Sequence, residues 1–275
     1  MWTLKAKKSL AEFLEFFKFN DFAFSLLNKW YRNNYIRVVN YHETYPENLE
    51  TLKSHMIWYE KNFENCSLEK LDKYFNEEHE FTDRPGLIIS FDDGFEGNYE
   101  CAYPLLKQHG FTGYFCVSVG LVGQASYMNK DQLKELIREN HVLCCHTYTH
   151  HRMEAYDDEH ILKKEILEAK TDLEAMLDTP CRIFSWVGGE ENHYTKKAAD
   201  LIRSAGYDYS LMNNSEPVSK HTNPFQINRT NINDDWKLGV AKFQLAGFMD
   251  MKYTPKRKRV NRLTKGVDSF DTNDR

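Results

Sequence analysis

The chain has 275 residues, of which 41% are hydrophobic and 14% aromatic, and it carries a formal net charge of −5. A chain of this length and composition can bury a large core, which excludes wholesale disorder. The mild acidity gives no overall electrostatic reason to bind nucleic acid, so no nucleic-acid partner is expected. Six scattered cysteines without a Cys-x-x-Cys pair favour a reduced, intracellular protein over a disulfide framework.

The N-terminal stretch has no pattern of a secretory signal. Charged residues interrupt the sequence that follows the basic segment 1–8, and no small-residue cleavage site follows an apolar run. No window reaches the roughly 20 uninterrupted apolar residues that a spanning helix needs. A cytoplasmic location is therefore expected.

Residues 9–31 have a helical spacing of apolar and aromatic side chains, and Asn20-Asp21 is expected to divide the stretch into two helices. We interpret residues 1–35 as an N-terminal helical extension. Its aromatic side could pack on the core, or it could rest on a partner or a membrane surface.

From residue 36 onward, predicted strands alternate with predicted helices. The strands are 36–41, 87–91, 113–117, 142–145, 182–187, 207–211 and 225–229; the helices are 49–63, 97–109, 130–139, 158–177 and 195–204, and a polar loop covers 76–84. Gly110 is expected to stop the second helix and Asn129 to cap the third. This alternation predicts an α/β protein with parallel strands, as either a barrel or a doubly wound sheet.

The C-terminal segment 251–275 changes character. It contains the run Lys256-Arg257-Lys258-Arg259 and ends in polar residues. The segment could be a solvated helix with a frayed tail. It could also dock on anionic lipid head groups, which would place the protein at the inner face of the membrane.

Two adjacent carboxylates, Asp92 and Asp93, end the buried strand 87–91 and precede Gly94. Buried carboxylates are costly unless each has a partner, and in barrels the chemistry lies at this end of the strands. One aspartate could bind a metal while its neighbour acts as a base, since successive residues point in different directions. A helix cap followed by a turn is the structural alternative.

Two histidines follow the strand 142–145. His146 and His150 stand four residues apart, so on a helical turn they would face the same way and could hold one metal ion. Both would lie at the end of a strand near the aspartate strand.

Together, Ser90-Phe91-Asp92-Asp93-Gly94 and His146-Thr-Tyr-Thr-His150 resemble the motifs of the polysaccharide deacetylase family, the NodB-homology group of carbohydrate esterases. The resemblance extends from about residue 38 to 229. It implies a distorted (β/α)7-type barrel, which we assign to residues 36–250.

The resemblance also implies roles for the four motif residues. Asp93, His146 and His150 would be the metal ligands, and Asp92 would be the catalytic base. Two histidines and a carboxylate suit Zn²⁺ or another divalent transition metal, with an open position for water and substrate. A structural metal site, or coincidence, is the alternative.

A third segment, 184–189, lies where the family has a loop that supplies an oxyanion-stabilising N–H. The resemblance implies that Gly188 provides this group. Trp186 could form a wall that stacks on a sugar ring; the alternative is a core tryptophan beside ordinary loop glycines. Ser185 replaces the family's arginine, which orients the base, and Arg229 could substitute for it or form an ordinary surface salt bridge.

The family's Leu-x-His motif, whose histidine is the general acid, is absent after residue 189. His193, in the loop after the third segment, is a candidate acid. His42, at the end of the first strand, is a second possibility and a candidate substrate-binding residue.

These observations predict a metal-dependent hydrolase that removes an N-acetyl group from an amino sugar. The substrate would be nucleotide-, lipid- or glycan-linked, as an intermediate in cell-surface polysaccharide assembly. Two alternatives stay open: a sugar N-deformylase with the same chemistry, and a glycan-binding pseudoenzyme.

Overall fold

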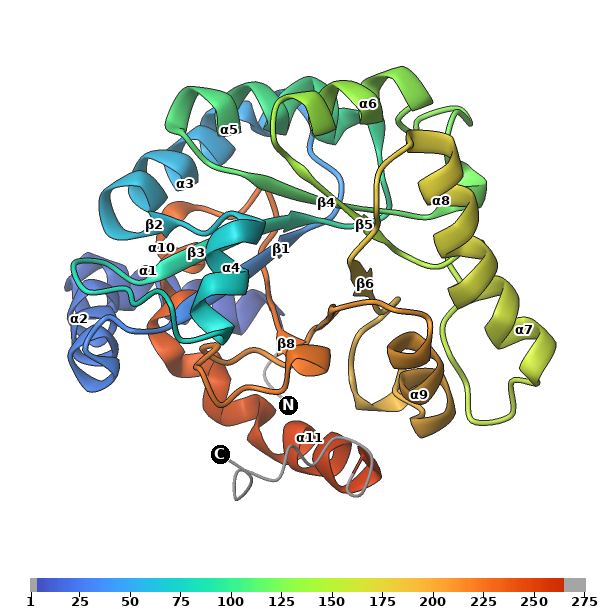
Figure 1. The fold of residues 1–275 in the computed structure, drawn as a ribbon. Helices are drawn as coiled ribbons and strands as arrows, with labels where there is room; N and C mark the ends of the chain where they lie inside the picture. The colour runs from blue at the N-terminus through green and yellow to red at the C-terminus, as the bar shows by residue number, and fades with distance from the viewer. Residues whose placement is uncertain (1–3, 265–275) are drawn as a thin grey trace.

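In the computed structural model, which describes residues 4–264, all strands belong to one parallel sheet. The strands are β1 (Ile36–Tyr41), β2 (Glu64–Asn65), β3 (Gly86–Phe91), β4 (Gly113–Val117), β5 (Val142–Cys145), β6 (Ile183–Ser185), β7 (Tyr209–Met212), β8 (Ile227–Asn228) and β9 (Thr230–Asn231). Their order is β8-β7-β6-β5-β4-β3-β1-β9, with β2 beside β3. Helices surround the sheet (Figure 1).

One short segment nearly closes this sheet into a barrel. Strand β8 pairs with β7, where Leu211 faces Ile227, and β9 pairs with β1, where Val39 faces Thr230. Only Arg229 separates the two strands. The same stretch of chain therefore touches both edges of the sheet, with a seam at Arg229. The predicted barrel is confirmed, and the doubly wound alternative is wrong.

Side chains alternate between two apolar clusters, as expected for strands that are covered on both sides. Val39, Ile89 and Phe115 belong to the cluster shared with the helices. Val38 and Ile88 belong to the cluster inside the barrel.

Apart from the helix Leu68–Phe75, whose Leu71 and Tyr74 join the cluster inside the barrel, the helices lie outside the strands. The helices are α1 (Leu4–Phe16), α2 (Phe19–Tyr31), α3 (Leu49–Asn62), α4 (Leu68–Phe75), α5 (Tyr103–His109), α6 (Lys130–Arg138), α7 (Glu159–Lys163), α8 (Ala169–Leu177), α9 (Lys196–Ser204), α10 (Leu238–Phe243) and α11 (Met249–Thr264). Asn129 caps α6 in a reciprocal capping box with Gln132, and Gly110 ends α5 in a left-handed conformation with φ of 71°. Both predicted helix boundaries are confirmed.

The two N-terminal helices are separated earlier than predicted. The break falls at Lys18, which adopts φ of 55°, and Asn20 lies inside α2. The Asn20 amide is buried and donates to the Ala11 and Gly239 carbonyls at 3.1 and 3.0 Å. The prediction of a break at Asn20 is wrong because this side chain finds its partners in other elements rather than in its own backbone.

Two predicted elements are less regular than expected. Residues 225–229 do not form one strand, because Pro224 begins a 3-10 turn (Pro224–Gln226) ahead of β8. Residues 158–177 form one helical stretch, but its middle, Lys164–Glu168, is a π-helical turn between α7 and α8. Helix α4 was not predicted at all.

The predicted C-terminal tail begins inside α11, which crosses residue 250 and packs on the barrel. Its basic run forms ion pairs: Lys256 contacts Glu190, Arg259 contacts Glu191, and the Arg257 Nε lies 2.8 Å from Glu216. Residues 265–275 of the tail lie outside the described residues. Within residues 4–264, no helix combines the length and the apolar character needed to cross a bilayer.

Candidate active site

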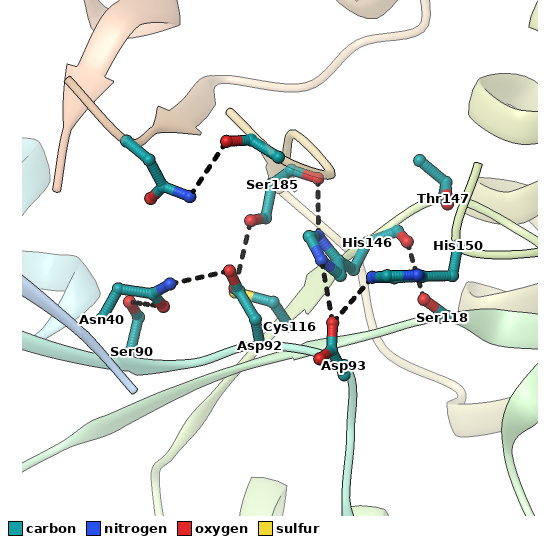
Figure 2. A network of polar contacts seen from close by, with 12 residues as sticks. Asn40, Ser90, Asp92, Asp93, Cys116, Ser118, His146, Thr147, His150 and Ser185 are labelled. Carbon is teal, nitrogen blue, oxygen red and sulfur yellow. Dashed lines mark hydrogen bonds and ion pairs between the residues drawn. The ribbon is translucent and has the colours of Figure 1, made fainter. Parts of the chain in front are cut away.

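The two aspartates leave β3 in different directions. The Asp92 backbone N–H still donates to the Tyr41 carbonyl of β1, at 2.9 Å, so Asp92 continues the strand. Asp93 turns into the left-handed region with φ of 73°, and Gly94 follows with φ of 83°. This backbone reversal sends the Asp92 side chain toward β1 and β6 and the Asp93 side chain toward the histidines (Figure 2).

Asp92 is 1% exposed, and side-chain hydrogen-bond donors surround its carboxylate. Arg229 clamps it with two parallel bonds, Nη1 to Oδ1 at 2.7 Å and Nη2 to Oδ2 at 2.8 Å. The Asn40 amide donates to Oδ2 at 2.8 Å, and the Ser185 hydroxyl donates to Oδ1 at 3.3 Å. The carboxylate is therefore fixed from three sides, in a geometry that a bidentate guanidinium supplies well.

Two side-chain amide oxygens hold the Arg229 guanidinium in place. Its Nη1 donates to the Asn40 amide oxygen at 2.9 Å, and its Nε donates to the Asn213 amide oxygen at 3.1 Å. Since Arg229 is fully buried, an ordinary surface salt bridge is excluded. Burial alone would raise the pKa of Asp92, but the charge of Arg229 and that of His146 lower the pKa below its usual value. Asp92 is therefore a carboxylate at neutral pH.

The three predicted metal ligands lie together. The Nε2 atoms of His146 and His150 lie 3.3 and 2.9 Å from the Asp93 Oδ1. The ligand atoms of all three residues fall within 4.8 Å of one another. Figure 2 shows both imidazoles converging on this carboxylate.

The protonation of this cluster fits a divalent cation. The His146 Nδ1 lies 2.9 Å from the Ser185 carbonyl, and because a carbonyl only accepts, this nitrogen must carry the proton. The ring then presents its other nitrogen, Nε2, to Asp93, whose buried Oδ1 has no hydrogen-bond donor. An imidazole that is anchored through its second nitrogen in this way is the usual arrangement of a metal ligand.

The histidine loop is not the helical turn that the i, i+4 spacing predicted. Thr147 and His150 adopt φ of 67° and 64°, and no helix forms over residues 146–150. Glu165, on the π-helical turn, holds the loop instead: its carboxylate accepts the Tyr148 and Thr149 N–H groups at 2.8 and 2.9 Å, and the Thr149 hydroxyl at 2.7 Å. π-helical turns are frequent at functional sites, and this one carries the residue that shapes the histidine loop.

Trp186 does not line a sugar site. Its side chain is 1% exposed, packs against Tyr194 with ring centroids 5.0 Å apart, and donates its indole N–H to the Ser210 hydroxyl at 3.2 Å. The expectation that Trp186 stacks on a sugar is therefore wrong, and the core alternative holds. The Trp186 N–H still donates to the Leu211 carbonyl of β7 at 3.1 Å, so the backbone continues the strand here and turns only at Gly188 and Gly189.

Gly188 and Gly189 adopt φ of 76° and 54°, in the left-handed region. The Gly188 N–H donates to no described residue, whereas the Gly189 carbonyl accepts the Asn213 N–H at 2.7 Å. A side chain at Gly188 would collide with the His193 ring, because its Cβ would lie 2.9 Å from Cδ2. Gly188 and His193 are therefore neighbours, and the structure leaves the predicted N–H free.

The two other candidate histidines lie on different sides of the site. The His193 Nδ1 is 3.4 Å from the Glu154 Oε1. His42 follows β1 on the surface, and its charge contributes to the lowered pKa of Asp92. Neither position distinguishes a proton donor from a substrate contact, so both roles stay predictions.

Three residues of the network were not predicted: Asn40, Ser90 and Asn213. Asn40 and Ser90 face each other in the register of β1 and β3, and the Ser90 hydroxyl donates to the Asn40 amide oxygen at 2.9 Å. The sequence contained a signal for both, since each is a polar residue in a fully buried strand, although β1 also carries the buried Arg37. Asn213 follows β7 directly and had no comparable signal.

The model of a family described as polysaccharide deacetylase matches residues 79–210, which include both aspartates and both histidines. Over these residues the chain is similar to the polysaccharide deacetylase family. The predicted enzyme class, a hydrolase that acts on amide bonds, agrees with the description of this family.

A curated relative, YxkH of Bacillus subtilis (strain 168), is 24% identical over 146 residues, which are 53% of this chain and 51% of YxkH. The chain thus matches about half the length of this polysaccharide deacetylase relative.

Solved structures share the fold of the family. PplD, a deacetylase from Streptococcus pyogenes, has a TM-score of 0.68 at 18% identity over 77% of this chain and 98% of its own. IcaB from Ammonifex degensii has a TM-score of 0.64 at 18% identity, covering 79% and 97%. A de-N-acetylase from Aggregatibacter actinomycetemcomitans has a TM-score of 0.65 at 15% identity, covering 76% and 99%.

Proposed function

We propose that this protein hydrolyses the N-acetyl group of an amino sugar with the help of a divalent metal ion, zinc being the first choice. One observation carries the proposal: Asp93, His146 and His150 converge beside a second carboxylate, Asp92, that Arg229 keeps charged. The comparisons support acetyl as the acyl group, since PplD was solved with acetate and the Aggregatibacter protein is a de-N-acetylase.

Asp93, His146 and His150 would hold the metal, and this donor set suits zinc. A bound zinc ion supplies Lewis acidity toward a carbonyl oxygen and lowers the pKa of water. The Ser185 carbonyl fixes the tautomer of His146, so the ring presents Nε2 to the site.

Asp92 would act as the general base. As a carboxylate at neutral pH it can accept the proton of the attacking water, and Arg229, Asn40 and Ser185 hold it in one orientation. A base held this firmly loses little entropy when the substrate arrives.

Gly188 would stabilise the negative charge that develops on the acyl oxygen, through its free N–H. His193, beside Gly188 and Glu154, would donate the proton that the departing amine needs. His42 is the competing donor on the opposite side of Asp92.

The direct test is acetate release by the zinc-loaded protein from N-acetylated sugar oligomers, and from nucleotide-linked and lipid-linked N-acetyl sugars. We expect Asp92→Asn to lose about 10²- to 10⁴-fold in rate while still binding zinc, and His150→Ala to lose zinc itself. His193→Gln and His42→Gln form a matched pair, and the donor is the one whose loss lowers kcat. No acetate from any substrate at full metal occupancy would refute the proposal.

A sugar N-deformylase would show formate instead of acetate in the same assay. Two observations favoured this alternative: Trp186 could have narrowed the acyl pocket, and the family's arginine is missing. Trp186 lies in the core and Arg229 forms an ion pair with Asp92, so neither observation supports a deformylase. A glycan-binding pseudoenzyme would be favoured only if Asp92→Asn changed no measurable activity.

A further inference from the structure

The N-terminal helices leave a large apolar surface uncovered. Helices α1 and α2 lie side by side at one edge of the molecule, coloured blue in Figure 1. Seven of their apolar side chains are exposed, two of them to 82%; we call this set the aromatic face: Phe13, Phe16, Phe17, Phe19, Phe22, Leu26 and Trp30. Single exposed apolar residues need no explanation, but a cluster of this size on one hairpin marks an interaction site.

The aromatic face is additional to the side that the two helices already use for packing. Ala11 and Phe24 are buried on that other side, and Phe24 contacts Trp58 of α3 with ring centroids 5.3 Å apart. On the exposed side the rings contact one another: Phe17 lies 5.2 Å from Phe13, and Phe19 lies 5.9 Å from Phe22, between centroids. Core packing therefore accounts for one side of the hairpin and leaves the aromatic face unexplained.

The acidic residues of the hairpin are all paired. They form ion pairs with lysines in or next to α10: Glu12 with Lys237 at 3.1 Å, and Glu15 and Asp21 with Lys242 at 2.7 and 3.0 Å. Their negative charge is therefore neutralised within the molecule.

The basic residues of the same region remain available. Lys5, Lys18, Lys29 and Arg32 form no ion pair with any carboxylate in the part of the chain that the structure describes. Lys18 sits in the turn between the two helices, next to Phe17 and Phe19. The exposed surface of the hairpin is thus apolar and aromatic, and the basic residues beside it give it a net positive charge.

We propose that the aromatic face docks on the surface of an anionic lipid bilayer. Phenylalanine, leucine and tryptophan on one side of a helix, with lysine and arginine beside them, are what an interfacial helix presents to acyl chains and anionic head groups. The basic C-terminal run is a weaker choice, because Lys256, Arg257 and Arg259 are occupied by glutamates. This inference does not rest on the proposed enzymatic activity.

The charge pattern also decides against a second copy of the chain as the occupant. Two aromatic faces brought together would place the cations of one hairpin against those of the other, with no free acid of the hairpin to offset them. An anionic bilayer supplies the opposite charge across the whole surface.

Trp30 provides a direct probe of the contact. It is 82% exposed, whereas Trp58, Trp186 and Trp236 are buried. In a Trp2→Phe background, the full-length protein would be mixed with vesicles of phosphatidylcholine and phosphatidylglycerol carrying brominated acyl chains. We expect the emission to shift to the blue and to be quenched, and we expect Trp30→Phe to bind equally while losing most of the signal. Unquenched emission with these vesicles would overturn the proposal.

Two variants separate the apolar and the charged contributions by cosedimentation. Phe16→Ser/Phe22→Ser should weaken vesicle binding more than about tenfold, whereas Tyr156→Ser, at a residue 83% exposed before α7, should not. Lys18→Glu/Lys29→Glu should weaken binding about tenfold or more to anionic vesicles only, and Lys130→Glu on α6 is its control.

The possible outcomes distinguish between a bilayer and a second copy of the chain as the partner of the aromatic face. Equal vesicle binding by Phe16→Ser/Phe22→Ser and the unchanged protein overturns the assignment of the aromatic face. A wild-type dimer in light scattering that this double variant converts to a monomer, together with absent vesicle binding, assigns the face to a second copy. Because the readout is binding, failure here leaves the acetate-release test untouched.

Discussion

Replacing Arg229 by methionine should destabilise the fold through the charge it leaves behind on Asp92. The two side chains are 0% and 2% exposed and joined by bonds of 2.7 and 2.8 Å. With charge centres about 4 Å apart and an effective dielectric near 20, their attraction is about 4 kcal/mol. Removing one partner of a buried pair costs about 3–5 kcal/mol, because the remaining charge is uncompensated. That is a large part of the roughly 5–15 kcal/mol that stabilises a typical domain.

A double-mutant cycle measures this coupling. Urea unfolding at pH 7 in EDTA would compare Arg229→Met, Asp92→Asn and the double variant, so that bound metal adds nothing to the free energy of unfolding. Asp92→Asn should also be destabilising, since it leaves the guanidinium unpaired. The double variant should lose less than the sum of the two by about 2–3 kcal/mol, the upper range for residues in direct contact.

Additive losses, or a loss below about 1 kcal/mol for Arg229→Met, would refute the reasoning. If Arg229→Met does not accumulate as folded protein, Arg229→Lys provides a second test. Lysine preserves the charge but cannot form both parallel bonds, so it should retain stability while lowering catalytic rate. Full catalytic rate in Arg229→Lys would show that the bidentate geometry is unimportant.

Four further predictions concern other parts of the molecule. Burial lowers the pKa of His55 from 6.5 to about 4. As the pH falls, the unfolded state therefore binds the proton first, and the free energy of unfolding should fall by about 3 kcal/mol between pH 6.5 and 4. His55→Gln should show a smaller fall in the urea midpoint over that range. Trp186→Phe should lower the free energy of unfolding by about 1–3 kcal/mol and leave KM unchanged. A raised KM with unchanged stability would indicate that Trp186 contacts the sugar after all. Asn213 links Arg229 to the Gly189 turn, so Asn213→Ala should lower kcat about tenfold or more with little change in KM, whereas Asn228→Ala on β8 should leave kcat unchanged. Glu165→Ala should weaken zinc affinity about 10- to 100-fold, measured by competition with a chromogenic chelator; unchanged affinity would show that the histidine loop needs no support.

The barrel strands and the meeting of Asp93 with the two histidines could be predicted from the sequence because both depend on short-range patterns. Continuous apolar runs marked the strands, and the motif residues at the ends of β3 and β5 had to converge once those strands became neighbours through β4. Arg229 could be proposed because the family's own arginine was missing and a cation was needed near Asp92.

The remainder depends on tertiary context. Trp186 and Gly188 are two residues apart, yet one points into the core and the other lies in a left-handed turn. Asn20 looked like a helix breaker, but carbonyls of α1 and α10 accept its amide N–H groups inside a helix. No local pattern states which of these partners will be within reach.

The i, i+4 spacing of His146 and His150 predicted that the two side chains would lie together, but the helical turn it implied does not form. Asp93, Thr147 and His150 all adopt left-handed backbone conformations, although none of them is glycine. Such conformations cost about 1–3 kcal/mol each and persist only where the surroundings impose them. Glu165 imposes the two in the histidine loop through three hydrogen bonds, and the strand end imposes the third. The two imidazoles therefore face Asp93 because Glu165, a buried carboxylate on a π-helical turn, holds a strained loop in place. In the proposed metal site, this strained loop would pre-organise the ligands before a metal binds.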